Sequence, residues 1–269
     1  MVIAPVLISN EARRSVSGPS RPPPSSNKIA LPIGASVSGA RPYTADVDAV
    51  VFDLDGVIAD SEGLHAEALH QVGRSIGLHT DLTQYIGWSD ADALADMLAG
   101  AGTARPRIED LLDAKSREYS RLLGRLRAFP GAAELVRACA QRWRVGLCTA
   151  TLRHDAHAAL ERLGLAQCFH AMVVFEDAPQ SKPDPAPYRL VAQRLGVAPN
   201  RCLAVEDSER GVASAAGAGL SVLAVGHTTG RERLDRAHAF VPSLAGLDAD
   251  ALESIARRII HRRINGTSA

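Results

Sequence analysis

Residues 50–57 read VVFDLDGV, an apolar run that ends in two aspartates separated by a single residue. Because side chains alternate along a strand, we expect Leu54 to point into the core and Asp53 and Asp55 to lie together at the rim. Gly56 permits a sharp exit that a side chain would hinder. Ligands bind outside the carboxyl ends of the strands of an open parallel sheet. One carboxylate there suits a nucleophile, the other suits a proton shuttle, and the pair attracts a hard cation such as Mg2+.

Apolar runs alternate with helical patterns from residue 46 onward. The strand-like runs lie at residues 48–54, 144–149, 171–175, 202–206 and 220–225. Alternation of this kind is typical of βαβ units, so the sequence predicts an α/β fold with a doubly wound, parallel, Rossmann-like sheet. Asp184 as N-cap and Pro185 at the first helical position predict the start of one intervening helix, and Gly196 predicts its end.

The first two strands are separated by many more residues than one crossover needs. A helix and its loops take about 30 residues, whereas this gap runs from residue 55 to residue 144. The excess at 61–127 has helical patterns throughout, with helix starts near Ser61 and at Ser89. We therefore expect an inserted, all-helical cap domain just after the aspartate pair, where it could open for substrate and close to exclude water.

The remaining residues divide into a core and two tails. The core comprises residues 46–60 and 128–245, and a C-terminal helix and tail follow at 246–269. Residues 1–45 hold seven of the fifteen prolines, eight serines and a net charge of +4, so we expect this tail to be disordered. Its composition also fits an organellar transit peptide, while an upstream start site or a dispensable tail explains it equally well.

The composition narrows the class of protein. With 46% hydrophobic and 22% charged residues the chain is typical of a globular protein, and no apolar run approaches the ~20 residues that span a membrane. Beyond residue 45 the net charge is −4, which offers no footprint for nucleic acid. The four cysteines show no CxxC spacing and indicate small buried hydrophobes in a reducing compartment. We expect a cytoplasmic monomer without nucleic-acid or membrane partners, unless residues 1–45 direct it to an organelle.

Polar residues also follow the later strands. Thr149 ends the second strand-like run, and Lys182 precedes Pro183 in the loop after the third. Glu206 and Asp207 end the fourth run. Because the carboxyl ends of parallel strands meet at one edge of the sheet, we expect these side chains to join the first two aspartates.

These motifs resemble those of the haloacid dehalogenase superfamily, in particular its helical-cap subgroup of sugar-phosphate phosphatases and beta-phosphoglucomutase. The resemblance covers about residues 48–227, and it rests on residues 53–57, Thr149, Lys182-Pro183 and 206–208. It implies a Mg2+-dependent phosphatase that acts on a small sugar phosphate or related phosphorylated metabolite. Asp53 would attack phosphorus and form an aspartyl phosphate, while Asp55 would protonate the leaving alcohol and later deprotonate the attacking water.

The resemblance also implies which residues hold the ligands. Thr149 and Lys182 would bind the phosphate, where charge stabilisation dominates the chemistry. Asp53 and Asp207 would carry Mg2+ together with the backbone carbonyl of Asp55, with Glu206 as a further acidic group of this metal site.

Each of these residues also has an ordinary structural interpretation. An aspartate after a strand is often a helix N-cap, and a lone threonine or lysine is usually a strand residue or a solvated side chain. Their joint order favours a catalytic role for Asp53, Asp55, Lys182 and Asp207. For Ser208 the functional and structural interpretations both stay open.

Three residues of the expected cap are candidates for substrate contacts. His65 follows Asp53 by twelve residues, the spacing at which the mutase branch carries a histidine at the mouth of the cap. Lys115 matches a cap lysine that can face the substrate, or it is a solvated helix residue. Trp88 could stack on a sugar face, although an aromatic residue of the cap core is the commoner outcome.

Two departures argue against a mutase. Its cap arginine for a second phosphate would fall at Asp90, whose acidic side chain would repel one, and its lysine after the second motif is replaced by Leu152. A mutase must hold a bisphosphate in either orientation, so hydrolysis is the better prediction and a phosphosugar mutase is the alternative.

A non-catalytic phospho-binding module or a phospho-receiver is a third hypothesis. Receivers combine Mg2+, aspartates, a threonine and a lysine, but their phosphorylated aspartate lies on a later strand and they lack a cap. Here the second strand ends in Cys148-Thr149. Since none of the catalytic motifs is missing, an enzyme is the favoured interpretation.

Overall fold

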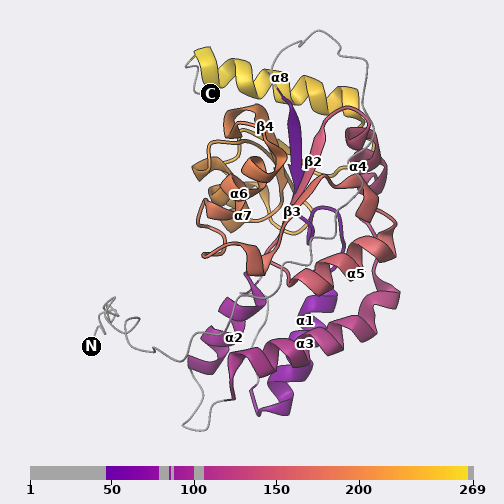
Figure 1. The fold of residues 1–269 in the computed structure, drawn as a ribbon, viewed down its shortest axis with the longest axis vertical. Helices are drawn as coiled ribbons and strands as arrows, with labels where there is room; N and C mark the ends of the chain where they lie inside the picture. Colours follow the sequence, from indigo (N-terminus) through magenta and orange to yellow (C-terminus); the bar gives the residue numbers. More distant parts are fainter. Residues whose placement is uncertain (1–46, 79–84, 86–87, 100–105, 266–269) are drawn as a thin grey trace, which may run out of the picture. The chain divides into compact units, whose positions relative to one another are not determined.

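The computed structural model describes residues 47–78, 85, 88–99 and 106–265. Six parallel strands form one sheet in the order β3-β2-β1-β4-β5-β6 (Figure 1). Their bounds are β1 Ala49–Phe52, β2 Arg144–Cys148, β3 Ala171–Val173, β4 Cys202–Glu206, β5 Ser221–Val225 and β6 Ala239–Val241. The predicted α/β class with a doubly wound parallel sheet is therefore confirmed. Strand β6 was not predicted, because it has only three residues and all of them are half-buried.

Helices cover both faces of the sheet because alternate strand residues are apolar on both sides. Val50 and Phe52 of β1 face one hydrophobic cluster, which includes side chains of α4, α5 and α8. Ala49 and Val51 face a second cluster, which includes side chains of α6 and α7. Figure 1 shows α6 and α7 on one side of the sheet and α4 and α5 on the other. The bounds are α4 Ala132–Ala140, α5 Arg153–Leu163, α6 Ala186–Leu195, α7 Glu209–Gly217 and α8 Ala249–Asn265.

The order of the strands creates the place for a binding site. Strand β1 lies in the middle, with β2 on one side and β4 on the other. The chain runs from β1 to β2 and β3 on one side and then crosses to β4 on the other, so the direction of winding reverses beside β1. Ligands bind in the crevice at the carboxyl ends of the strands at such a reversal. Short 3-10 turns in the described connecting segments include Leu123–Arg125, Ala166–Cys168, Phe175–Asp177, Pro199–Arg201 and Arg231–Arg233.

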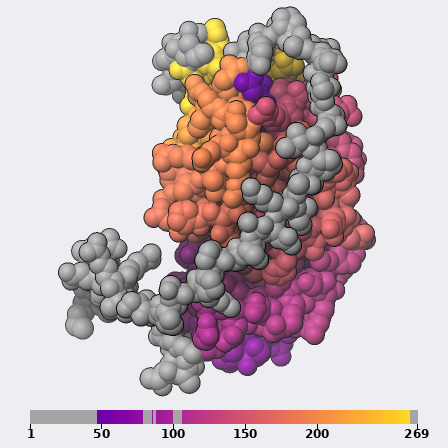
Figure 2. All heavy atoms as spheres, in the orientation of Figure 1, coloured from indigo at the N-terminus to yellow at the C-terminus, as the bar shows by residue number. Residues whose placement is uncertain are grey.

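The insertion after β1 is helical in its described residues, as the sequence predicts. It contains α1 Glu62–Ser75, α2 Asp90–Ala99 and α3 Ile108–Leu122, which share a separate small hydrophobic cluster. Ser89 begins α2 as expected, since its hydroxyl accepts the N–H of Asp92 at 3.1 Å. Figure 2 shows the cap side chains, coloured indigo to magenta, in contact with those of the core along the face in view.

Two backbone segments connect the cap to the core. The N–H of Asp60 donates to the carbonyl of Arg127, and the N–H of Phe129 donates to the carbonyl of Ile58, both at 2.9 Å. The chain thus enters and leaves the cap through one short paired strap. The exact domain boundaries, with the cap at 61–127 and a C-terminal part from 246, stay a prediction.

Some local expectations are confirmed and one is wrong by a residue. Helix α6 begins at Ala186, with Pro185 in the N-cap position, rather than at Pro185. The carboxylate of Asp184 accepts the N–H of Ala186 at 2.8 Å, which satisfies a donor in the first turn of the helix. Gly196 ends α6 in the left-handed conformation, as expected.

The four cysteines are free and buried, in agreement with their prediction as small core residues. Within the described residues no helix is long and apolar enough to cross a membrane. The predicted disorder of residues 1–45 lies outside the described residues.

Candidate active site

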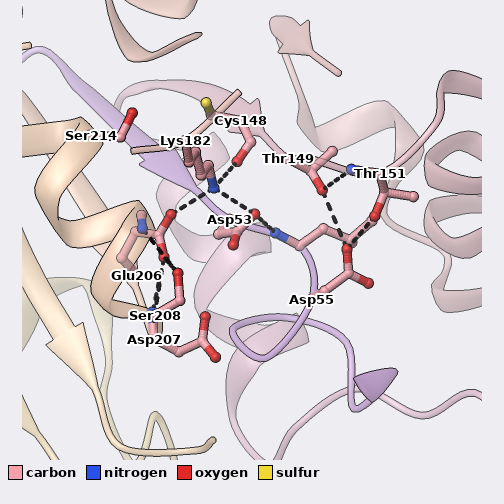
Figure 3. Close-up of polar contacts among 12 residues, drawn as sticks. Asp53, Asp55, Cys148, Thr149, Thr151, Lys182, Glu206, Asp207, Ser208 and Ser214 are labelled. Carbon is pink, nitrogen blue, oxygen red and sulfur yellow. Dashed lines mark hydrogen bonds and ion pairs between the residues drawn. The ribbon is translucent and has the colours of Figure 1, made fainter. Parts of the chain in front are cut away.

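The two aspartates after β1 lie at the carboxyl edge of the sheet, and the leucine between them is fully buried. Asp53 is itself nearly buried, and its Oδ1 accepts the N–H of Leu54 at 2.8 Å. Gly56 has φ +79°, the left-handed conformation that favours glycine. The chain therefore turns away from the strand directly after the aspartates, as the sequence predicts (Figure 3).

Lys182 brings a positive charge to Asp53. Its Nζ lies 3.1 Å from Asp53 Oδ1 and 2.6 Å from Glu206 Oε1, and it donates to the carbonyl of Cys148 at 2.9 Å. Burial alone would lower the pKa of Lys182, but the neighbouring carboxylates of Asp53 and Glu206 outweigh it and raise that pKa well above its ordinary value. Three acceptors thus surround the ammonium, and the two carboxylates favour its charged form.

Glu206 holds Lys182 in place. Its Oε1 also accepts the Tyr188 hydroxyl at 2.7 Å, while its Oε2 faces the N–H groups of Asp207 and Ser208 and the Ser208 hydroxyl. Five protein donors therefore surround this carboxylate. The arrangement suits a group that orients Lys182 more than one that is free to bind a metal.

Three buried carboxylates nevertheless lie close together. One oxygen each of Asp53, Glu206 and Asp207 lies within 4.8 Å of the others. Burial raises the pKa of Asp53 and of Asp207 well above the ordinary value, and the neighbouring carboxylates raise it further. Lys182 pairs with two of these three carboxylates, Asp53 and Glu206, so this group of oxygen donors fits a hard divalent cation that would supply further positive charge.

Asp207 is held against the turn after β1. The Thr228 hydroxyl donates to its Oδ2, and that oxygen occupies the space beside Gly56. A Cβ added to Gly56 would lie 2.0 Å from Asp207 Oδ2. Two features therefore require a glycine at this position: its positive φ and the Asp207 carboxylate packed against it.

Asp55 has quite different surroundings, because four side chains hold its carboxylate. Ser61 donates to Oδ1 at 2.6 Å and His65 Nε2 lies 3.1 Å from the same oxygen. The hydroxyls of Thr151 and Thr149 approach Oδ2 at 2.6 Å and 3.3 Å. Burial opposes the charged form, but the contacts with His65, Ser61 and Thr151 outweigh it and hold the pKa of Asp55 well below its ordinary value.

His65 is oriented from behind by the cap. Lys115 Nζ lies 2.5 Å from His65 Nδ1 and donates to Asp90 Oδ2 at 2.7 Å. An ammonium can only donate, so Nδ1 accepts and the ring proton lies on Nε2, which faces Asp55. The Tyr119 ring stacks on His65 with centroids 4.2 Å apart.

A cavity of about 320 Å³ lies between the core and the cap. Its core side carries Asp53, Asp55, Thr149, Thr151, Lys182, Asp207 and Ser208. Its cap side carries Glu62, His65, Leu69, Tyr85, Trp88, Asp90 and Ala93. The cavity therefore has a polar, charged end at the sheet and an apolar, aromatic end with two carboxylates on the cap.

The sequence-predicted residues come together around this cavity with two exceptions, Glu206, which is buried behind Lys182, and Lys115. Lys115 is fully buried and is not among the described residues that line the cavity, so its position suits holding His65 more than touching a substrate. Trp88 lines the cavity and packs edge-on against Tyr85 at 5.5 Å, and its expected stacking on a sugar stays a prediction. Ser208 is the N-cap of α7, where its Oγ accepts the N–H of Gly211 at 3.0 Å.

Sequence reasoning missed Thr228, which donates to Asp207, and four further residues of the site. Ser61 and Thr151 both donate to Asp55, and Tyr188 donates to Glu206. Thr151 has a usable signal, because it lies two residues after Thr149 at a strand end. The fourth is Glu62, which lines the cavity, and burial raises its pKa to about 7.

Comparison with known proteins agrees with this geometry. A model of the family described as haloacid dehalogenase-like hydrolase matches residues 47–219. The chain is 34% identical over 181 residues to a phosphorylated carbohydrates phosphatase of Thermotoga maritima, a match that covers 65% of this chain and 82% of the relative. It is 31% identical over 189 residues to a beta-phosphoglucomutase of Bacillus subtilis, covering 66% of this chain and 83% of the relative.

A solved structure supports the same assignment. The crystal structure of CbbY from Rhodobacter sphaeroides in complex with phosphate matches with a TM-score of 0.70 and 26% sequence identity, covering 77% of this chain and 99% of that one. The family match spans more than half of the chain and includes all the strands that carry the site. The chain therefore belongs to the haloacid dehalogenase-like hydrolases.

Proposed function

We propose that this protein is a Mg2+-dependent phosphatase that hydrolyses a small sugar phosphate or a related phosphorylated metabolite through an aspartyl-phosphate intermediate. One observation carries the proposal: two adjacent carboxylates face one cavity in opposite chemical settings. Asp53 is paired with Lys182 inside an acidic cluster, whereas Asp55 is held by hydroxyls and His65. Different settings for two carboxylates are what a nucleophile and a proton shuttle require.

Asp53 is the nucleophile in this proposal. Its Oδ1 is engaged by the Leu54 N–H and the Lys182 ammonium. In the part of the chain that the structure describes, no protein donor contacts Oδ2, so this oxygen can attack phosphorus. The new O–P bond forms as the ester P–O bond breaks, and Asp55 gives its proton to the departing alcohol oxygen.

Asp55 then acts as the base of the second half-reaction. It takes a proton from a water whose oxygen attacks phosphorus, and the P–O bond to Asp53 breaks to release phosphate. The four side chains around Asp55 favour its ionised form, which suits this step. A bound phosphate dianion next to Asp55 favours the protonated form instead, which suits the first step.

Thr149 and Lys182 would bind the phosphate oxygens, with the ammonium giving up one of its three protein acceptors to do so, and Asp53, the Asp55 carbonyl and Asp207 would hold the cation. When bound, Mg2+ would neutralise charge on the phosphate and so let an anionic nucleophile approach. We place Glu206 behind Lys182 as its positioning partner, because both of its oxygens already face protein donors.

The cap end of the cavity indicates a substrate with one phosphate. Glu62 and Asp90 are acidic, and the described cap residues that line the cavity include no lysine or arginine. Trp88, Tyr85 and Leu69 offer apolar surface for the carbon face of a small sugar. A second phosphate would meet carboxylates there, which disfavours the bisphosphate that a phosphosugar mutase must hold.

The proposal is tested by measuring phosphate release from a panel of sugar phosphates with Mg2+ or with EDTA. We expect release that EDTA abolishes and that Asp53→Asn lacks. A parallel reaction contains beta-glucose 1-phosphate with a trace of the 1,6-bisphosphate. Isomerisation to glucose 6-phosphate without net release would replace the phosphatase by the mutase, and silence in both reactions across a broad panel would favour the binding module.

We further propose that the enzyme acts as a monomer in the cytoplasm, without nucleic-acid or membrane partners. The four free, buried cysteines suit a reducing compartment. Size-exclusion chromatography with light scattering tests the monomer, for which a mass near 28.5 kDa is expected.

A further inference from the structure

The first turn of α2 in the cap contacts two residues of the core. Asp92 Oδ2 accepts the Ser181 hydroxyl at 2.7 Å and lies 3.4 Å from Nη2 of Arg210. Ser181 directly precedes Lys182 in the loop that follows β3, and Arg210 lies on α7 directly after the acidic cluster. The cap is thus attached here to both core segments that build the phosphate end of the cavity.

Arg210 makes two further contacts at this seam. Its guanidinium carbon lies 4.8 Å from the centroid of the Trp88 ring, a cation–π distance. Its Nη2 also donates to the carbonyl of Lys182 at 2.5 Å. One side chain therefore touches a wall of the cavity, an acidic residue of the cap and the backbone of the lysine paired with Asp53.

The Nε of Arg210 indicates that the rest of the guanidinium sets the pose of this side chain. Nε is buried and has no hydrogen-bond partner in the described part of the protein. A buried N–H without a partner opposes folding, so the contacts of the same guanidinium with Trp88, Asp92 and Lys182 must outweigh it. The planar guanidinium can stack and donate at once, which a lysine ammonium cannot do in the same way.

The contacts of α2 differ from the other attachments of the cap. The strap near Asp60 and Arg127 is the covalent entry and exit of the chain, and α3 packs against α5 of the core. Figure 1 shows α2 beneath α6 and α7, away from the side on which α3 meets α5. Side-chain contacts that can break while the strap stays intact are suited to a closing motion.

We propose that Arg210 is a positioning residue that latches the cap closed over the substrate, by stacking on Trp88 and joining Asp92 to the Lys182 loop. The inference rests on the proposed function in one respect, that this cavity is the substrate site. Substrate binds best when Trp88 lies against the cavity, so loss of the latch lowers the population of the closed state and weakens apparent binding.

Kinetics test the latch with a matched control. Arg210→Gln should raise KM about tenfold, as expected for losing a cation–π contact and charged hydrogen bonds. Its kcat should stay within about threefold, since Lys182 keeps its pairs with Asp53 and Glu206. Arg210→Lys, which keeps the charge, should recover only part of the loss. The control Arg233→Gln removes an exposed arginine that pairs with Glu209, the neighbour of Arg210 on α7. This substitution should change neither constant.

A double-mutant cycle separates the latch from a general weakening of the fold. If Asp92 acts through Arg210, the double variant of Asp92→Asn with Arg210→Gln should have no higher KM than Arg210→Gln alone. Additive effects of the two substitutions, with both variants as thermally stable as the parent, would contradict a shared latch.

Fluorescence gives a readout that does not depend on turnover. The two tryptophans of the chain are Trp88 and Trp143, so Trp143→Phe leaves Trp88 as the reporter. Adding Arg210→Gln should move the Trp88 emission to longer wavelength and raise its acrylamide quenching constant about twofold, because the ring loses its cover. Adding Arg233→Gln instead should change neither property.

The fluorescence measurement and the phosphate-release assay together distinguish failure of the latch from failure of the proposed function. Unchanged emission and quenching in Arg210→Gln would overturn the latch, whatever the enzyme hydrolyses. A clear change in quenching, in a protein that releases no phosphate from any substrate tested, would support the latch and contradict the phosphatase.

Discussion

A substitution at Gly211 would displace the buried carboxylate of Glu206 and so test its role in the site. Gly211 lies in the first turn of α7, and a Cβ added there would meet Glu206 Oε1 at 2.0 Å and its Cδ and Oε2 at 2.1 Å. Gly211→Ala therefore cannot be accommodated without moving the Glu206 carboxylate by about 1.4 Å, the distance to an ordinary contact of 3.4 Å. That oxygen lies 2.6 Å from Lys182 Nζ and 2.7 Å from the Tyr188 hydroxyl, so both contacts would break.

The two opposing effects of Gly211→Ala can be compared in size. Helix propensity alone favours alanine over glycine by about 1 kcal/mol. Moving one member of a fully buried ion pair away from the other costs about 3–5 kcal/mol. The net effect is a loss of about 2–4 kcal/mol in the free energy of unfolding, which lowers Tm by about 5–15 °C for a domain of this size. Displacing the partner of Lys182 should also lower kcat/KM at least about 100-fold, the typical effect of losing one charge-stabilising group.

Gly217→Ala is the matched control because it changes the same residue type in the same helix. A Cβ at Gly217 would meet Pro185 at 3.6 Å and 3.9 Å, which are ordinary contacts. We expect its Tm to stay the same or rise slightly and its activity to be unchanged. Thermal unfolding by circular dichroism and phosphate release would be measured for both variants. Equal stability and activity of the two would refute the view that the buried Glu206–Lys182 pair supports the site.

Three further predictions concern charge and metal. Asp53→Asn should abolish turnover with an unchanged circular dichroism spectrum, and Asp55→Ala should retain residual turnover only on esters with good leaving groups; equal slowing on good and poor leaving groups would contradict the proton-shuttle role. Glu62 holds its proton to a pH of about 7 in the folded protein against an ordinary pKa of 4.5, so the folded state binds more protons in this window and stability falls as pH rises through it. Glu62→Gln should therefore raise Tm at pH 8 but not at pH 4, and a gain at pH 4 alone would refute the assignment. Mg2+ should raise the Tm of the parent protein by binding the acidic cluster, and Asp207→Asn should remove this effect.

The main elements of the fold could be predicted because each has a strong local signal. The apolar run at 202–206 coincides with β4, and the excess length between the first two strands corresponds to the helical cap. Strand β6 could not be predicted, since Ala239–Val241 is three residues long and its pairing with β5 supplies what its own pattern lacks. Helix α6 begins at Ala186, one residue after the predicted start at Pro185, because Asp184 accepts a first-turn N–H from outside the helix.

The core side of the site was predictable for a topological reason. Glu206 ends β4, and Thr149, Lys182 and Asp207 follow strands or lie in the loops after them. Parallel strands bring such positions to one edge. The hydroxyls of Ser61 and Thr151 escaped notice because serine and threonine occur everywhere on a surface. Only the three-dimensional structure shows that both donate to Asp55.

The cap side was less predictable because its residues depend on how two elements pack. Lys115 was expected to face the substrate or solvent, yet it is fully buried between His65 and Asp90. The contact of Trp88 with Arg210 joins residues 122 positions apart, and no local pattern reveals such a pair. The role of these cap residues in selecting the substrate is therefore a proposal from the structure.

The nucleophile can be identified most directly by trapping the phosphorylated enzyme. A sugar phosphate labelled with radioactive phosphorus would be turned over with Mg2+, quenched in acid within the first turnovers, and the labelled peptide mapped. The account predicts a hydroxylamine-labile acyl phosphate on Asp53 that the Asp53→Asn variant lacks. Label on another residue, or phosphate release by Asp53→Asn at the parent rate, would contradict it.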